Sequence, residues 1–421
     1  MDIILEILFV FLLFALNGKH TKCFLLLISL QTVSFFLQFL VGNSCKYSTF
    51  YTFFNILFVN LNLFLIMGPW RYGNLKVIYM KNEDYVLFFK KCLYAILAVN
   101  IILNSAILFI VLIYIPDIAA FKAEKAFHDL YDSIPYFANV FRYAYTSQNL
   151  GFFAIPFFFY YLQKRELKKA GLALFFSGST LISAFAFYSR ALILTYVLVF
   201  LGYYLLINSA IDDKLRKKIS SVAKKIFLII GCLFIVITVV RFSAMDYYAD
   251  RIPENSVIKN PILYSLVDYA SQGYPNGLNL LEEYSDERNL EGEDMFRTIY
   301  QFLDFFHIIS WDSEESKEKI AAAYNYDGGA FHGYTCQMVF NFGYILTLLV
   351  SVFYYFFVRH KLRGNTSVSL LELCLLILFL VMPLVAIFYS GLGLLYFSVM
   401  FMIFTKFLYV LKRIFTVSYK S

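Results

Sequence analysis

The stretch that decides the fold is FFKKCLYAILAVNIILNSAILFIVLIY, residues 88–114, whose only charged side chains are Lys90 and Lys91 near its start. As a helix, an apolar run of about 20 residues crosses the roughly 30 Å hydrocarbon core of a bilayer. The stretch therefore predicts a membrane-spanning helix. The whole chain has the same character, because 60% of its 421 residues are hydrophobic and 15% are charged, whereas soluble proteins have about 25% charged residues.

Similar apolar runs recur on both sides of this stretch. We predict eleven spans, at 3–17, 23–41, 51–68, 88–114, 149–162, 170–188, 191–208, 226–240, 336–358, 368–388 and 392–410. The first could pass for a secretory signal, but its start is acidic (Asp2, Glu6) and no small-residue cleavage site follows, so we interpret it as a retained helix. The predicted fold is all-α, a polytopic integral membrane protein with one transmembrane domain, residues 1–421.

The charges of the connecting segments predict the topology. Two thirds of the 36 Lys and Arg residues, but few of the 29 Asp and Glu residues, lie in segments 17–22, 69–91, 163–169, 211–225, 359–367 and 406–421. Lys and Arg are enriched in cytoplasmic loops, so these segments and the C-terminus are predicted to be cytoplasmic. The net charge of +7 fits this topology and contact with anionic membrane lipids, and it does not indicate a nucleic-acid partner.

Two longer segments are predicted on the outer side, residues 116–148 and the acidic residues 241–334. In the second, QGYPNG at 272–277 is typical of a turn. Residues 293–311 have apolar side chains at helical spacing, but Arg297, Asp304 and His307 argue against a full span. We interpret 293–311 as a helix at the membrane interface. The alternative is a helix packed on a small core of the loop itself.

Several motifs are missing from the sequence. It contains no P-loop, no G-x-G-x-x-G, no Asp-x-Asp and no zinc signature, so we expect no nucleotide, metal or other cofactor. Few charges interrupt the centres of the predicted spans, which argues against an ion-coupled transporter. The six cysteines are scattered and are expected to be small core residues, with a Cys45–Cys336 bridge as the alternative.

Some predicted spans carry polar side chains. Gln31, Ser34 and Gln38 fall on one helical face, where they predict hydrogen bonds between helices or, alternatively, the wall of a polar cavity. Tyrosines gather in the outer segments, where they would suit stacking against sugars, although tyrosine is also common in loops and at membrane interfaces.

Four arginines at outer ends of spans run against the charge bias of the topology. They are Arg142, Arg190, Arg241 and Arg251. The guanidinium group offers a planar, permanently charged fork to phosphate. A pyrophosphate leaving group on a lipid carrier would need such a cluster. The alternative is that these side chains reach lipid headgroups or pair with acids of the loops.

A histidine precedes the ninth predicted span in DGGAFHGY, residues 327–334. Small residues around His332 would allow a substrate to approach closely. A histidine here could act as a base or donate a hydrogen bond to phosphate. Asp327 and Tyr334 are the other candidate site residues of this stretch.

Two short motifs carry a resemblance to a known family. Residues 188–192, Tyr-Ser-Arg-Ala-Leu, match a Ser-Arg-small turn at the start of a span, and residues 332–346 match a His followed by an Asn-Phe-Gly start of the next span. With the long outer loop before the last spans, the chain resembles the O-antigen polymerases (Wzy-type) and the related O-antigen ligases. The ligases more often have His-Asn and a Glu before the Gly, where this chain has Gly333 and Phe342, which favours polymerase.

The resemblance implies a glycosyltransferase of the bacterial inner membrane, acting in lipopolysaccharide biosynthesis on its periplasmic face. Its substrate would be an undecaprenyl-pyrophosphate-linked oligosaccharide, and a chain-length regulator protein is an implied partner. Arg190, with Arg142 and Arg241, would hold the departing pyrophosphate, and His332 or Asp327 would deprotonate the acceptor hydroxyl. An O-antigen ligase stays open as the alternative. A lipid-linked oligosaccharide flippase is the rival of another class, disfavoured by the long acidic loop and the nearly charge-free spans.

Overall fold

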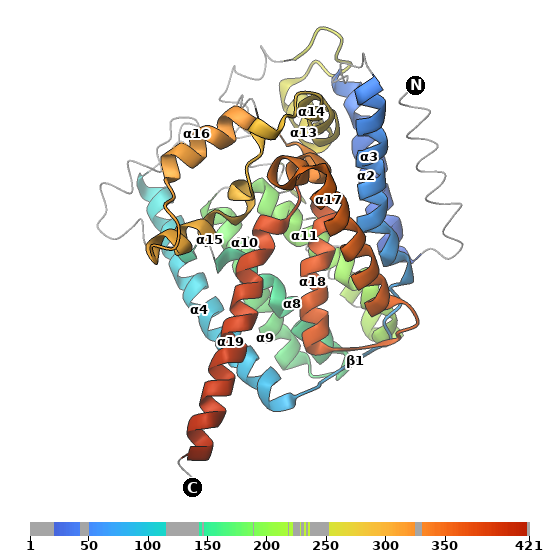
Figure 1. The fold of residues 1–421 in the computed structure, drawn as a ribbon. Coiled ribbons are helices and arrows are strands. Elements are labelled where there is room, and N and C mark those ends of the chain that lie inside the picture. The colour runs from blue at the N-terminus through green and yellow to red at the C-terminus, as the bar shows by residue number, and fades with distance from the viewer. Residues whose placement is uncertain are drawn as a thin grey trace. The chain divides into compact units, whose positions relative to one another are not determined.

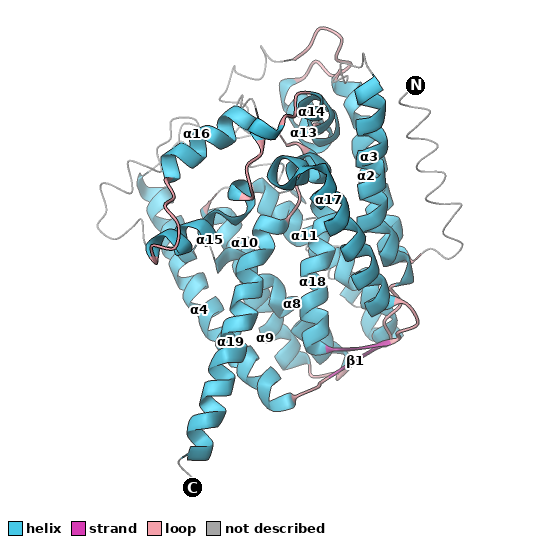
Figure 2. Ribbon diagram, in the orientation of Figure 1, coloured by secondary structure: helices cyan, strands magenta, loops and turns pink. Residues whose placement is uncertain are grey.

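The computed structural model describes residues 21–42, 50–114, 143–144, 147–187, 189–217, 219–221, 252–324 and 331–418, with four single positions between 228 and 235. Figures 1 and 2 show a chain made of helices with one short strand pair. It forms two compact units. Unit 1 comprises residues 1–73, 248–364 and 379–393, and unit 2 comprises residues 74–247, 365–378 and 394–421.

Unit 1 is built on three long apolar helices, α2 (Lys22–Val41), α3 (Phe50–Met67) and α17 (Gly333–Leu362). The short 3-10 helix η1 (Gly68–Tyr72) extends α3. The acidic segment adds α13 (Pro261–Ser271), α14 (Gly273–Glu282), the 3-10 helix η5 (Asp286–Arg288), α15 (Glu293–Phe305) and α16 (Ser313–Ala323). Helix α2 starts at the N-cap Thr21, whose hydroxyl accepts from Phe24 N, and ends at Gly42 in a left-handed conformation.

Unit 2 contains α4 (Glu83–Tyr114), α8 (Ala154–Gln163), α9 (Leu167–Ser177), α10 (Ser179–Ala186) and α11 (Arg190–Ile207). It also holds the 3-10 helices η2 (Gln148–Phe153) and η3 (Asn208–Ala210). Strands β1 (Val77–Tyr79) and β2 (Ser367–Ser369) pair in parallel, with Ile78 opposite Val368. The remaining helices are α18 (Leu370–Val385) and α19 (Leu392–Ser418).

Six helices among the described residues are long and apolar enough to cross a membrane. They coincide with the predicted spans at 23–41, 51–68, 88–114, 170–188, 191–208 and 336–358. The 170–188 span is formed by α9 and α10 together, joined at Gly178. The predicted helix at 3–17 and most of that at 226–240 lie outside the described residues. The predicted helical fold is therefore confirmed, and the six helices are compatible with a membrane protein.

The predicted span at 149–162 has a different form. It consists of η2 followed by the ten-residue α8, which at 1.5 Å per residue is about 15 Å long and so shorter than the hydrocarbon core. Every residue from Ser147 to Leu162 is buried. Periodicity could not reveal this, because a helix enclosed on all sides is as uniformly apolar as one surrounded by lipid.

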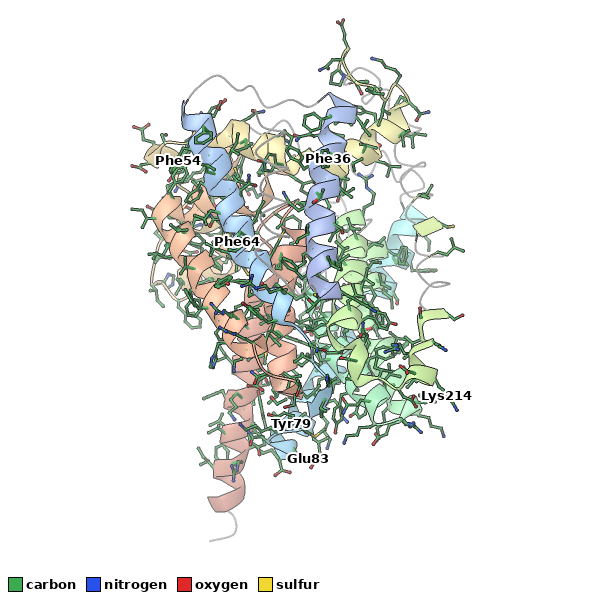
Figure 3. All side chains as sticks on the ribbon, turned by 90° about the vertical axis from the view of Figure 1, so that its right-hand side faces the viewer. Phe36, Phe54, Phe64, Tyr79, Glu83 and Lys214 are labelled. Carbon is green, nitrogen blue, oxygen red and sulfur yellow. The ribbon has the colours of Figure 1, made fainter. Side chains whose placement is uncertain are left out.

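The basic segments of unit 2 meet at one end. Besides the β1–β2 pair, the side-chain amide of Gln163 bonds both backbone groups of Ile78, at 2.7 and 3.2 Å. The Ser209 hydroxyl donates to Leu75 O at 2.8 Å, and in Figure 3 Tyr79, Glu83 and Lys214 lie toward the same end. Within unit 2, residues 74–91, 163–169, 209–217 and 365–369 therefore lie at one end, as a common side of the membrane would require.

Unit 1 has two contrasting ends. At one end, the Thr21 hydroxyl donates to Trp70 O at 2.9 Å, beside the basic last turn of α17. At the other end, Val257 N donates to Leu40 O at 3.0 Å, where the acidic segment closes over α2. Figure 1 shows α13 and α14 at this second end, next to the start of α17. The acidic and the basic segments of unit 1 therefore lie at opposite ends of its long helices.

The turn predicted at 272–277 is wrong, because most of QGYPNG forms the start of α14. Pro275 is tolerated in a first turn, where the missing N–H needs no partner. The two glycines serve close packing: a Cβ on Gly273 would lie 1.9 Å from Ile387 O, and a Cβ on Gly277 would lie 2.2 Å from His332 O. Glycine and proline, which are typical of a turn, here allow α14 to pack closely against its neighbours.

Candidate functional site

The structure divides the predicted site residues. His332 and Tyr334 belong to unit 1, and Arg190 belongs to unit 2. Arg142, Arg241, Arg251 and Asp327 lie outside the described residues. Three of the seven predicted residues can therefore be followed into the structure.

His332 is the residue before the first turn of α17 and is buried, with 9% of its surface exposed. Its ring stacks on Tyr324, with centroids 4.4 Å apart and an interplanar angle of 15°. Burial lowers the pKa of His332 to about 4, against a smaller opposing effect of Asp294. The imidazole is therefore neutral at physiological pH and can accept a proton or a hydrogen bond.

Asp294 in α15 is the acidic partner of this site. One carboxylate oxygen of Asp294 accepts from Tyr324 Oη at 3.0 Å and from Gln337 Nε2 at 2.7 Å. Gln337 in turn accepts from Ser390 N at 2.7 Å through its Oε1. Asn341, one helical turn further on, donates from Nδ2 to Tyr324 Oη at 3.4 Å. The network joins α15, α17 and the segment after α18 around one carboxylate.

A second acidic residue, Glu293, holds the segment 293–324 together. Its two carboxylate oxygens accept from Trp311 Nε1 at 3.2 Å and from Lys319 Nζ at 3.1 Å. Burial alone would raise the pKa of Glu293, but the donors around it, Ser316, Lys319 and Trp311, outweigh burial and lower it. Through these contacts, α15 packs against α16 within its own segment.

The first turn of α17 is fixed by backbone hydrogen bonds. Gly333 N donates to Phe388 O at 3.0 Å, and Tyr334 N donates to Ala386 O at 2.8 Å. Gly333 has φ of +72°, a conformation that favours glycine. The exposed N–H groups of a helix start are thus satisfied by a neighbouring loop, which holds the adjacent His332 in place.

Helix α17 is interrupted at Gly343, where φ is +71° and ψ is 172°. Only glycine adopts this region readily. Near the interruption, Phe340 O accepts from Leu290 N at 2.7 Å, and Gly343 O accepts from the Thr347 hydroxyl at 2.7 Å. The break therefore separates a ten-residue first part, which carries Gln337 and Asn341, from the longer apolar remainder. Broken helices of this kind occur in membrane proteins where backbone lines a site.

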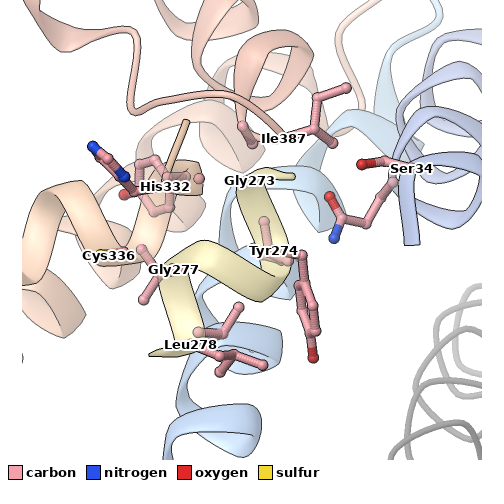
Figure 4. A pocket seen from close by; sticks show the side chains of 15 residues that line it. Ser34, Gly273, Tyr274, Gly277, Leu278, His332, Cys336 and Ile387 are labelled. Carbon is pink, nitrogen blue, oxygen red and sulfur yellow. The ribbon is translucent and has the colours of Figure 1, made fainter. Parts of the chain in front are cut away.

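Figure 4 shows a small cavity between the start of α17, α14 and α2. Its volume is about 20 Å³, and its lining includes Gln31, Ser34, His332 and Thr335. The buried Gln31 Oε1 and Thr335 Oγ1 have no hydrogen-bond partner within the described part of the chain. The space suits a water molecule and is too small for a sugar. Ser34 also donates to Ala270 O at 2.7 Å, so the polar face of α2 serves both the packing and the cavity that its sequence predicted as alternatives.

Arg190 occupies the first position of α11, directly after the N-cap Ser189, whose hydroxyl accepts from Leu192 N at 3.3 Å. Only 5% of the Arg190 surface is exposed. The start of a helix carries partial positive charge, so a cation there is unfavourable unless an anion is near. The binding of an anion by Arg190 therefore stays a prediction, and its burial at a helix start is the feature to be tested.

Buried polar side chains bond one another between the helices that precede Arg190 in unit 2. Asn100, fully buried in α4, donates to Ser147 Oγ at 2.7 Å and accepts from Ser183 Oγ at 3.3 Å. The Thr180 hydroxyl donates to Gln148 O at 2.8 Å. A Cβ on Gly151 would lie 2.3 Å from Thr180 Oγ1. These hydrogen bonds stabilise polar groups inside an apolar environment, where leaving them without partners would be costly.

Sequence reasoning missed the central residues of the site, Asp294, Tyr324 and Gln337. Asp294 was only one of many acids in the loop, and its pairing with α17 spans 43 residues. The available signal was Asn341 in the Asn-Phe-Gly motif, because one helical turn separates it from Gln337. Tyr334 is a predicted site residue, but its side chain is 1% exposed and shares a hydrogen bond of 3.0 Å with Ser351, so it packs in the core beside α17.

Cys336 is a free, buried cysteine, which agrees with the expectation of a small core residue and not with the alternative of a bridge to Cys45. Tyr264 and Tyr274 are buried, and Tyr269 packs on Phe331 and Phe388. Tyr264 and Tyr274 therefore belong to the packed interior, and Tyr269 is half-buried against the two phenylalanines. Comparisons of the chain with protein-family models, with curated proteins and with solved structures give no match.

Proposed function

We propose that the chain is an O-antigen polymerase, which joins undecaprenyl-pyrophosphate-linked oligosaccharide units on the periplasmic face of the bacterial inner membrane. The observation that carries the proposal is the constellation of His332, Tyr324 and Asp294 at the start of α17. It combines a neutral imidazole with a carboxylate. Both groups lie in or next to the acidic segment, at the end of unit 1 opposite the basic last turn of α17.

The proposed topology keeps the eleven predicted spans, with η2 and α8 together as the one at 149–162. It has a cytoplasmic C-terminus, and residues 116–148 and 241–334 are in the periplasm. The meeting of the basic segments at one end of unit 2 supports it. So does the acidic segment of unit 1 at the opposite end of α17 from Arg359 and Lys361. Reaction on the periplasmic side would then proceed without nucleotide, driven by release of the lipid pyrophosphate.

In the proposed reaction, the hydroxyl of the acceptor sugar attacks the anomeric carbon of the growing chain. A new glycosidic C–O bond forms, and the bond from that carbon to the pyrophosphate oxygen breaks. His332 or Asp294 takes the hydroxyl proton. For Arg190, with Arg142 and Arg241, we keep the role that the resemblance implies, which is to stabilise the charge that develops on the departing undecaprenyl pyrophosphate. Asp294 replaces Asp327 as the preferred carboxylate, because it contacts the residues that hold His332.

An O-antigen ligase is the second candidate of the same class, since it would use the same donor and the same types of residue. A flippase is the candidate of another class. The break of α17 at Gly343 would suit a transporter as well as an enzyme. The enzyme is favoured by the carboxylate and the imidazole that Tyr324 links, and by the lack of charged clusters in the sequence of the predicted span centres.

The deciding experiment is a lipopolysaccharide gel of a strain that lacks the gene. Loss of a polymerase leaves lipid A core bearing a single repeat unit, because flipping and ligation continue. Loss of a ligase or a flippase leaves bare core. We expect core plus one unit with the ladder gone, and the same pattern for His332→Ala. A bare-core band alone would reject the polymerase in favour of ligase or flippase.

A further inference from the structure

Three guanidinium groups from two elements of unit 1 converge on one aromatic ring. The ring is that of Tyr72, the last residue of η1. The Cζ atoms of Arg71, Arg359 and Arg363 lie 4.7, 5.8 and 5.8 Å from its centroid. Arg71 also donates from Nη2 to the Tyr72 hydroxyl at 2.6 Å. Like charges gathered at one ring repel one another, and an anion among them relieves this repulsion.

The ring is fixed by a buried hydrogen-bonded support. Trp70, two residues before Tyr72, is fully buried and donates from Nε1 to Tyr354 Oη at 2.8 Å. Tyr354 in turn donates to Phe379 O at 2.7 Å. Gly68 allows η1 to approach α17, because a Cβ there would lie 3.3 Å from the ring of Tyr355. The packing of η1 on α17 therefore fixes the backbone that carries Arg71 and Tyr72 next to the last turn of α17.

The cluster lies where two apolar helices end. The candidate spans Phe53–Tyr72 and Gly333–Leu362 both terminate at it, and Arg363 is the C-cap of α17. Tyrosine and arginine are typical of the level of the lipid headgroups. An anion bound here would therefore be at the depth of a phospholipid phosphate.

A simpler explanation covers only part of the cluster. Basic residues in the last turn of a helix interact favourably with its dipole, which accounts for Arg359. It does not account for Arg71, which comes from η1, or for the convergence on Tyr72. In the described chain, neither Arg359 nor Arg363 forms an ion pair with a carboxylate.

We propose that Arg71, Arg359 and Arg363, arranged around Tyr72, form a binding site for a phosphate group. Phosphate suits planar guanidinium forks, which donate two parallel hydrogen bonds. The same chemistry is offered by an anionic phospholipid headgroup and by soluble inorganic phosphate. The site lies at the basic end of unit 1, apart from the constellation at His332, and it stands whether or not the chain is a polymerase.

The test compares the thermal midpoint of the full chain in phosphatidylcholine vesicles with and without phosphatidylglycerol. A second arm titrates inorganic phosphate onto the protein in detergent. The test variant is Arg359→Gln with Arg363→Gln. The matched control is Lys168→Gln with Lys214→Gln, which removes the same charge from exposed positions of other basic segments.

We expect the thermal midpoint of the wild type and of the control to rise in at least one arm. The test variant should lose that rise, with the ligand concentration at half-saturation shifted by at least about tenfold. An effect of phosphatidylglycerol alone identifies the headgroup, and a saturable effect of inorganic phosphate identifies the soluble ion. Arg359→Lys with Arg363→Lys keeps the charge and decides the matter if the glutamine variant does not fold: it should bind more weakly than wild type. Equal stabilisation of all variants, equal loss in test and control, or no stabilisation of the wild type in either arm would overturn the site.

Discussion

Tyr324 and His332 stack face to face at the junction of α16 and α17, with ring centroids 4.4 Å apart. The hydroxyl of the same tyrosine donates to Asp294 at 3.0 Å. One side chain therefore fixes the plane of the imidazole and the position of the carboxylate. Such preorganisation is what a site for proton transfer requires, because geometry must be set before the pKa matters.

Asp294→Asn tests the carboxylate while keeping its shape. If Asp294 takes part in proton transfer, polymerisation by the purified protein should fall by about 10²- to 10⁴-fold, with the protein still present in the membrane at the wild-type level. Asp286→Asn is the matched control, because Asp286 is an exposed acid of the same segment, and its activity should stay at the wild-type level. Equal activity of the two variants would exclude Asp294 from the reaction.

The pH dependence of stability tests the environment of His332. Its folded pKa, about 4, lies below the unfolded value of 6.5, so the unfolded chain binds more protons between these two values. Stability should therefore fall as pH drops from about 6.5 to 4, by up to about 3 kcal/mol. Thermal midpoints in detergent at several pH values measure this, and His332→Gln should show a smaller loss on acidification. An unchanged pH profile in the variant would contradict the burial effect.

Arg190→Ala should leave the protein in the membrane and abolish long glycan chains, because a buried guanidinium at a helix start is the proposed anion contact. Arg190→Lys should restore short chains only, since the fork is lost. The readout is a lipopolysaccharide gel beside an immunoblot of the membrane fraction. A full ladder from the alanine variant would refute the role.

Two further variants separate contact from local structure at this position. Ser189→Ala removes the N-cap and should cost about 1 kcal/mol of stability while leaving the ladder in place. Arg216→Ala removes a surface arginine paired with Asp213 and should change neither stability nor glycan length. If Ser189→Ala matched Arg190→Ala on the gel, the effect of Arg190 would be structural.

Gly343→Ala should destabilise the protein by about 1–3 kcal/mol, because the backbone at this position adopts a conformation that is strained for alanine. The added Cβ itself has room, with Tyr284 Oη nearest at 3.6 Å, so the cost isolates the backbone. Gly171→Ala in α9 is the control, since no atom lies within 4 Å of its added Cβ. That change should be neutral or stabilising by about 0.5–1 kcal/mol. Thermal unfolding in detergent measures both changes. Equal thermal midpoints for Gly343→Ala and Gly171→Ala would argue against the break in α17.

The topology predicts opposite labelling of two cysteines, Ser285→Cys and Lys217→Cys, in a variant whose six native cysteines are replaced by Ala. Both positions are exposed. A membrane-impermeant maleimide added to intact spheroplasts should label position 285 and spare position 217. Gly277 is avoided because a side chain there would collide with His332 O. Labelling of both positions, or of neither, before lysis would refute the proposed sides.

The sequence was sufficient to predict where the long apolar helices lie, because their length and composition follow from the bilayer alone. It failed where tertiary packing decides. The helix α8 is short and enclosed, although its composition is that of a span. Gly273 and Gly277 mark a close helix crossing, although their neighbours are typical of a turn.

The site was predictable only in part, for a similar reason. His332 stood out through its small neighbours and its place before a span, and the structure shows it buried against Tyr324. Asp294 could not be distinguished from the other acids of its loop, because only the folded segment brings it to Gln337. Local patterns identify residues beside helix ends, whereas contacts between distant segments need the fold.

The pairing of β1 with β2 has a consequence for biosynthesis. The two strands are parallel and about 290 residues apart in the chain. At roughly 5–20 residues per second, residue 367 leaves the ribosome on the order of 15–60 seconds after residue 77. During that interval β1 lacks its partner strand, and within the described part of the chain only Ile78 has a backbone partner already made, the side chain of Gln163. The first helices of unit 2 must therefore stay in place as an unfinished assembly. Truncated chains that end before residue 367 should therefore be the preferred substrates of membrane quality-control proteases.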